Sequence, residues 1–162
     1  MKPVMQAPPV VTYRGFSGAR HGEGASSLHA LVERCDEATW QLLARLGYGP
    51  RRMANERRGL MALEQRIVHI EELRAATVLH IESDLLELGD TRLRCLHRLC
   101  DSESQRTLST MEVTFALTGI DEGSGTALPA DLIQRARAVF PQLRRGGGAP
   151  ASAPRETADL PI

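Results

Sequence analysis

The sequence lacks any long apolar run. No segment of its 162 residues approaches the roughly 20 apolar residues that a transmembrane helix needs. Residues 1–9 also lack the basic and then apolar order of a secretory signal. We therefore expect a cytoplasmic protein that makes no membrane contact.

An excess of charge of one sign is lacking too. Twenty basic and twenty acidic residues cancel, so nothing in the net charge favours nucleic acid as a partner. Lys2 is the only lysine, and all other cationic side chains are arginines. Arginine suits phosphate and carboxylate ligands, although a bias in genomic base composition explains the same preference.

Familiar catalytic and metal-binding motifs are absent. The chain contains no glycine-rich phosphate loop, HExxH, CxxC or GxSxG sequence. Its three cysteines, Cys35, Cys95 and Cys100, form an odd set without the spacing of metal ligands. We expect reduced thiols, no metal and no serine-hydrolase chemistry.

One long amphipathic helix is present. Apolar or small residues recur at spacings of three and four over residues 28–46, which places on one helical face Leu28, Leu31, Val32, Cys35, Ala38, Leu42, Leu43 and Leu46. Gly47 stands at the expected C-terminal stop. Ser26 or Ser27 can cap the other end by accepting a hydrogen bond from a free backbone amide.

The rest of the ordered chain reads mostly as strands. The candidates are residues 10–16, 59–71, 77–88, 91–100 and 105–119, with hairpin turns near 88–90 and 101–104. Within residues 77–88, the apolar positions change parity between Ile81 and Leu86, which predicts a bulge or a strand buried on both sides. Residues 49–58 read as a connector and residues 128–140 as a short helix.

The predicted fold class is α+β. A curved antiparallel sheet of about five strands wraps around one long helix, and a short helix follows at the C-terminal end. We expect one domain over residues 10–140, a flexible N-terminus over residues 1–9 and a disordered tail over residues 141–162. The free edge of such a sheet favours a homodimer or a dimer of dimers.

The turn before the long helix concentrates polar groups, because residues 21–27 read His-Gly-Glu-Gly-Ala-Ser-Ser. His21 can act as a general base toward water near neutral pH, and Glu23 can orient it or be the base itself. The alternative is chance, since a histidine and a glutamate often share a surface loop.

With these elements in order, the sequence resembles the hotdog acyl-CoA thioesterases of the 4-hydroxybenzoyl-CoA type. It is most similar to the betainyl-CoA thioesterases of carnitine breakdown. The resemblance covers residues 10–140 and depends on the order and spacing of several segments. These segments are residues 37–43, residues 46–47, residues 60–73, Leu93, Leu96, His97 and residues 111–115. Within residues 60–73, Glu64 stands at a position that is usually acidic in that family.

In that family the turn reads Asp-x-x-Gly-His-x-Asn, and its aspartate serves as base or nucleophile toward the thioester. A gapless alignment keeps Gly24, puts His21 at the aspartate position, and replaces the family histidine and asparagine by alanine and Ser27. The resemblance implies catalysis by His21 and Glu23. It also implies that backbone amides near Ser26 and Ser27 stabilise the oxyanion.

Two further residues are candidates for substrate binding. Glu64 lies mid-strand in an apolar segment, where an unpaired carboxylate would be costly to bury. It either faces the substrate pocket and a cationic acyl group, or it pairs with Arg66 or a neighbouring strand, or it faces solvent. His97 alternates with Cys95 and Leu99, which suits a substrate contact or a hydrogen-bonded core histidine.

Four arginines in the connector, Arg51, Arg52, Arg57 and Arg58, are candidates for the phosphates of coenzyme A. The alternative is that this connector is simply arginine-rich and solvated.

The resemblance implies hydrolysis of an acyl-CoA or acyl-carrier thioester. No cofactor is expected, because coenzyme A is part of the substrate. The altered turn favours a second reading, a catalytically silent hotdog module that binds an acyl ligand or a protein partner. A dehydratase-type hotdog enzyme is a weaker third reading.

Overall fold

The computed structural model describes residues 10–17, 28–74, 76–121 and 125–144. Its elements confirm the predicted α+β fold of one curved antiparallel sheet, one long helix and a short C-terminal helix. In chain order they are β1 (Val10–Ser17), α1 (Leu28–Arg45), α2 (Pro50–Asn55), β2 (Arg58–His69), β3 (Thr77–Leu88), β4 (Arg92–Asp101), β5 (Thr107–Gly119), α3 (Ala130–Val139) and the 3-10 helix η1 (Pro141–Arg144).

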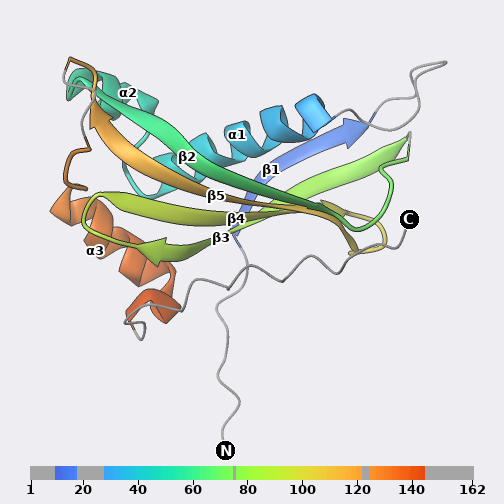
Figure 1. Cartoon of the computed structure of the whole chain (residues 1–162). Coiled ribbons are helices and arrows are strands. Elements are labelled where there is room, and N and C mark those ends of the chain that lie inside the picture. The colour runs from blue at the N-terminus through green and yellow to red at the C-terminus, as the bar shows by residue number, and fades with distance from the viewer. Residues whose placement is uncertain (1–9, 18–27, 75, 122–124, 145–162) are drawn as a thin grey trace, which may run out of the picture.

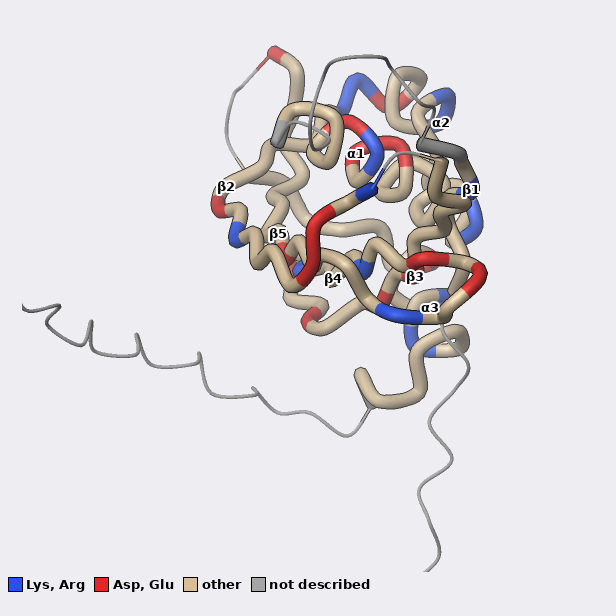
Figure 2. Tube along the Cα trace, turned by 90° about the vertical axis from the view of Figure 1, so that its right-hand side faces the viewer, with Lys and Arg blue, Asp and Glu red and all other residues tan. Residues whose placement is uncertain are grey.

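The five strands form one sheet in the order β1-β3-β4-β5-β2, and every neighbouring pair is antiparallel. The sheet curves around α1, which lies along its concave side (Figure 1). Seen from the end, β2 lies on one side of α1 and β1 on the other, with the remaining strands between them (Figure 2). Acidic and basic residues are interspersed over the whole trace in that view. This is the hotdog arrangement.

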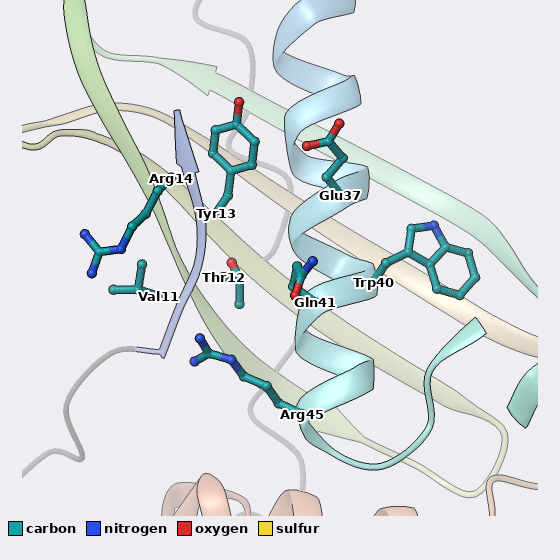
Figure 3. A pocket seen from close by; sticks show the side chains of 8 residues that line it. All are labelled: Val11, Thr12, Tyr13, Arg14, Glu37, Trp40, Gln41 and Arg45. Carbon is teal, nitrogen blue, oxygen red and sulfur yellow. The ribbon is translucent and has the colours of Figure 1, made fainter. Parts of the chain in front are cut away.

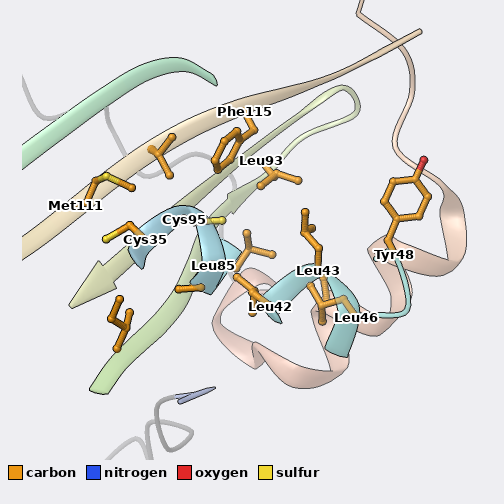
Figure 4. Packing of buried hydrophobic residues seen from close by; sticks show 14 of the residues in the cluster. Cys35, Leu42, Leu43, Leu46, Tyr48, Leu85, Leu93, Cys95, Met111 and Phe115 are labelled. Atoms are coloured by element: carbon orange, nitrogen blue, oxygen red, sulfur yellow. The ribbon is translucent and has the colours of Figure 1, made fainter. Parts of the chain in front are cut away.

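The apolar stripe of α1 and the inner positions of the sheet form the core (Figure 4). Ala38, Leu42 and Leu43 on α1 are at most 1% exposed, as are Met111 and Val113 on β5. Their positions follow the periods of 3.6 and 2 that the sequence displays. Other buried members of the core include Leu31, Cys35, Leu46, Leu79, Ile81, Leu85, Leu93, Cys95, Leu99, Phe115 and Leu117.

Gly47 ends α1, as the sequence predicts. Its φ of +75° is left-handed, a conformation that glycine adopts without steric cost. Its amide donates to the carbonyl of Ala44 at 3.0 Å, and the amide of Tyr48 donates to the carbonyl of Leu43 at 2.8 Å. A Cβ at this position would also collide with the guanidinium of Arg135.

Bulges give the sheet its curvature. Each of the four strand pairings contains one register shift, namely between Val11 and Tyr13, Ala62 and Glu64, Leu85 and Glu87, and Leu99 and Cys100. The shift after Leu85 lies where the apolar positions change parity, so the bulge reading of that strand is confirmed.

Two segments differ from the sequence-based expectation. The connector contains the short helix α2, whose only buried residue is Met53, so no periodic pattern marks it. The stretch assigned to the tail begins with η1, where Leu143 packs against the core. In the described part of the chain, no helix is long and apolar enough to cross a membrane.

Candidate functional site

The predicted catalytic turn, with His21, Glu23, Ser26 and Ser27, lies outside the described residues. The structure does describe the helix that follows. The first turn of α1 carries no acidic residue, so no carboxylate within that turn offsets the positive end of the helix dipole. His29 in that turn points to solvent and pairs with Glu33 at 3.1 Å.

A groove of about 510 Å³ runs between β1 and the outer side of α1 (Figure 3). This volume lies within the ordinary range of small-molecule sites. Residues from the edge strand and from the polar side of the helix line it: Val11, Thr12, Tyr13, Arg14, Glu37, Trp40, Gln41 and Arg45.

The groove combines two cations, one carboxylate and two aromatic rings. Tyr13 projects from β1 toward α1, and Arg45 extends from α1 toward β1, whereas Arg14 points away from the helix (Figure 3). Trp40 is 38% exposed, although its size predicts burial. Sequence reasoning missed this groove, because polar positions on a helix and an edge strand look like ordinary solvated surface.

His97 lies in the core rather than in this groove. It is fully buried on the inner face of β4, and both ring nitrogens have partners. The hydroxyl of Thr39 on α1 donates to the carbonyl of Cys35 at 3.0 Å, so its oxygen accepts from Nε2 of His97 at 2.9 Å. The hydroxyl of Ser83 on β3 then donates to Nδ1 at 2.6 Å.

The network continues to β1, because the hydroxyl oxygen of Thr12 lies 2.7 Å from the hydroxyl oxygen of Ser83. One histidine thus joins α1 to three strands. Burial lowers the pKa of His97 to about 4, so the ring is neutral at physiological pH. This placement corresponds to the hydrogen-bonded core histidine that the sequence analysis gave as one of two alternatives. The hydrogen bonds of the His97 ring reach none of the other predicted site residues that the structure describes.

Arg52 is held in a cluster at the end of α1. Its guanidinium donates to both carboxylate oxygens of Asp131 on α3, at 2.6 and 3.0 Å, and to Glu56 at 2.7 Å. It also lies 4.9 Å from the ring centroid of Tyr48, whose hydroxyl donates to Glu56. The guanidinium lowers the pKa of Asp131 and of Glu56. Burial and the bond to Glu56 raise the pKa of Tyr48 to about 12.

The other connector arginines are scattered. Arg57 donates to both carboxylate oxygens of Asp121, at 2.6 and 2.9 Å. Arg51 is exposed and Arg58 half-buried. The structure therefore gives Arg52 and Arg57 carboxylate partners, and the set predicted for the phosphates of coenzyme A does not converge on one point.

Glu64 lies on the exposed edge strand β2, directly after the bulge that follows Ala62. Among the described residues it forms no ion pair with Arg66. The structure therefore places it at the surface of this chain and away from the groove.

A sequence match identifies the protein family. Residues 27–141 match the model of the thioesterase-like superfamily. The chain belongs to this superfamily. The match begins at the start of α1 and ends just after α3, so it spans nearly all of the described fold. No curated protein matches the sequence significantly.

Solved structures agree on the fold. A proposed thioesterase from Pseudomonas putida KT2440 has a TM-score of 0.74 at 21% identity and covers 96% of this chain and 99% of its own. A hypothetical protein from Staphylococcus aureus in complex with CoA has a TM-score of 0.76 at 12% identity, covering 94% and 97%. A 1,4-dihydroxy-2-naphthoyl-CoA thioesterase from Synechocystis has a TM-score of 0.68 at 15% identity, covering 78% and 94%.

Burial of neutral His97 predicts that this member of the superfamily loses stability in acid. The unfolded chain binds a proton near the ordinary pKa of 6.5, whereas the folded chain binds it near 4. The contribution of neutral His97 to the free energy of unfolding is therefore fully present above pH 6.5. It is lost as the pH falls toward 4, which lowers the free energy of unfolding by on the order of 3 kcal/mol. Urea unfolding of the wild type and of His97→Gln at several pH values checks this. Equal pH dependence of the two proteins would contradict it.

Proposed function

We propose that this protein hydrolyses the thioester of an acyl-CoA or acyl-carrier substrate. The observation that carries the proposal is the thioesterase-like match over residues 27–141, which spans α1 to α3. Support comes from relatives of the same fold, one solved with CoA and one a CoA thioesterase by name. A cytoplasmic location stays a prediction from the sequence.

In the proposed reaction, the thioester carbonyl lies at the N-terminal end of α1. His21 removes a proton from water, which attacks the carbonyl carbon, and Glu23 orients the imidazole. Backbone amides near Ser26 and Ser27 donate to the resulting oxyanion. The tetrahedral intermediate then expels the thiolate, which takes the proton back from His21, and the acid and the free thiol leave.

The first turn of α1 suits this charge development. Because it carries no carboxylate, the partial positive charge of the helix end remains available to an oxyanion. The hydrophobic contact of α1 with the sheet holds that end in a defined position.

A betainyl group is the proposed acyl class. The resemblance of the sequence to betainyl-CoA thioesterases supports this class. The ammonium nitrogen of a betainyl group is only two bonds from the thioester carbonyl carbon, whereas Glu37 lies nine residues along α1 from Leu28, about 13 Å, so the groove beside α1 suits a more distant part of the substrate. Arg45 extends from α1 toward β1 in this groove and suits an anionic group of the carrier. Glu64 reaches such a substrate only if a second chain brings β2 to the site.

A homodimer through β2 is the proposed assembly. Within the described residues this strand pairs only with β5, so its other edge presents backbone donors and acceptors to a further strand. Four large apolar side chains on or just after it are 41–56% exposed: Met61, Leu63, Val68 and Ile70. Antiparallel pairing of two β2 strands about a two-fold axis extends the sheet and covers this surface.

The proposed base predicts a large loss of rate in a His21→Ala variant. We expect the release of free thiol from acyl-CoA to fall about 100-fold to 10,000-fold, as is typical for loss of a general base. Acyl-CoA affinity should change little. The control is His29→Ala, because that side chain is exposed and paired with Glu33.

The assay uses a panel of short, aromatic and betainyl thioesters. Equal rates for His21→Ala and the wild type would exclude His21 as the base. Tight binding without turnover of any substrate would instead establish the silent binding module.

The proposed acyl class predicts that the protein prefers a thioester with a positively charged acyl group. Betainyl-CoA should have a higher kcat/KM than 3,3-dimethylbutanoyl-CoA, which has the same shape but no charge. A preference for the neutral substrate would contradict the assignment.

The proposed interface predicts that Leu63→Glu yields a monomer. A charge on this 41% exposed side chain leaves the fold of one chain intact but would be buried in the dimer. Leu86→Glu is the control, because Leu86 is similarly exposed, at 37%, on β3. Light scattering after size exclusion measures the mass. A monomeric wild type would contradict the proposed assembly.

A further inference from the structure

Three chemically different ligand groups meet on the outer face of the sheet, on the side away from α1. His80 and Glu82 are two residues apart on β3, so both side chains lie on the same face. Cys100 on β4 is the direct cross-strand partner of His80. One donor atom from each, a ring nitrogen, a carboxylate oxygen and the thiol sulfur, lies within 4.8 Å of the other two.

We propose that His80, Glu82 and Cys100 bind a zinc-class divalent metal ion. A mixed set of nitrogen, oxygen and sulfur donors suits Zn²⁺ and the neighbouring transition metals, whereas Mg²⁺ and Ca²⁺ select oxygen alone. Three protein ligands leave the fourth tetrahedral position for water.

The histidine is oriented as a metal ligand would be. The hydroxyl of Ser102 lies 2.8 Å from Nδ1 of His80, which fixes the ring and leaves Nε2 toward Glu82. Nε2 is 3.5 Å from the nearer carboxylate oxygen of Glu82. That separation is long for a strong hydrogen bond, yet it is close to the roughly 3.4 Å between two tetrahedral ligands that each lie about 2.1 Å from zinc.

The surrounding charges leave Glu82 available. Its cross-strand partner, Arg98, donates to Asp84 at 2.6 Å and forms no ion pair with Glu82 in the described part of the chain. On the neighbouring strand β1, the cross-strand partner of His80 is Arg14. Arg14 is exposed, so its flexible side chain can extend into solvent. No arginine in the described ranges therefore competes directly for the Glu82 carboxylate.

The thiol has only weak partners. Cys100 is 3% exposed, and its sulfur lies 3.6 Å from the carbonyl oxygen of Arg98 and 3.8 Å from the hydroxyl of Thr107. Burial raises its pKa, and the charge of Glu82 adds to this effect. As the sulfur–metal bond forms, the thiol proton passes to solvent and the ion compensates the thiolate charge.

The bound ion would join β3 to β4 beside the turn that leads into β5. The site lies on the opposite face from α1 and its groove, so it is independent of the proposed hydrolysis. Sequence spacing does not reveal it, because two ligands come from one strand and the third comes from the next. Only the register of the sheet brings them together.

Cobalt is the spectroscopic probe. The reduced, tag-free full chain, freed of metal by a chelator, is titrated with Co²⁺ and should develop a near-ultraviolet thiolate-to-cobalt charge-transfer band. Added Zn²⁺ should remove the band by competition. Cys100→Ser should abolish it, and His80→Gln or Glu82→Gln should weaken Co²⁺ binding by about tenfold or more.

His69→Gln is the matched control. Its Nδ1 also lies 3.2 Å from a serine hydroxyl, that of Ser109, but no cysteine pairs with it in the sheet. This variant should bind Co²⁺ as the wild type does. No charge-transfer band in the wild type, or an undiminished band in Cys100→Ser, would overturn the proposal.

A second measurement needs no variant. Zn²⁺ should protect Cys100 of the wild type from alkylation, as read by peptide mass spectrometry, by at least tenfold in rate. Cys35 and Cys95, which lie in the core, are the internal references and should show no such change. Equal alkylation of Cys100 with and without Zn²⁺ would also overturn the proposal.

Discussion

The apolar face of α1 has to be covered along the whole length of an 18-residue helix. A flat sheet contacts a helix along one line only, so the strands curve to bring Leu79, Leu93 and Met111 to its sides. The polar face of α1 then remains on the open side, between the edge strands β1 and β2 (Figure 2). The groove and the start of the helix owe their positions to this single contact.

Apolar packing is not directional, so it does not by itself determine how far α1 lies along the sheet. The buried hydrogen bond between Thr39 and His97 is directional, and it determines the position of α1 along the sheet. A helix displaced by one turn would leave the buried Nε2 of His97 without its partner, and an unpaired buried polar group is costly. Arg52 acts similarly at the far end, where it ties α2 and α3 to Gly47, just after the end of α1.

The sequence predicts those elements in which apolar residues recur at a regular local spacing. Periods of 3.6 and 2 locate α1 and the strands, and the parity change between Ile81 and Leu86 locates a bulge. It does not reveal α2, which buries only Met53, or the partners of Arg52, which lie far apart in the chain. The contacts of His97 and the neighbourhood of Cys100 depend on strand register, and register exists only once the whole sheet has formed.

The four bulges have a consequence for how the chain can change length. A bulge inserts one residue into a strand, and all residues beyond it face the opposite side compared with an unbroken strand. Loss of one residue at any of the four shifts would therefore turn core side chains outward for the rest of that strand. Insertions and deletions should accumulate in the turns instead, and the strand lengths of related sequences should be nearly invariant.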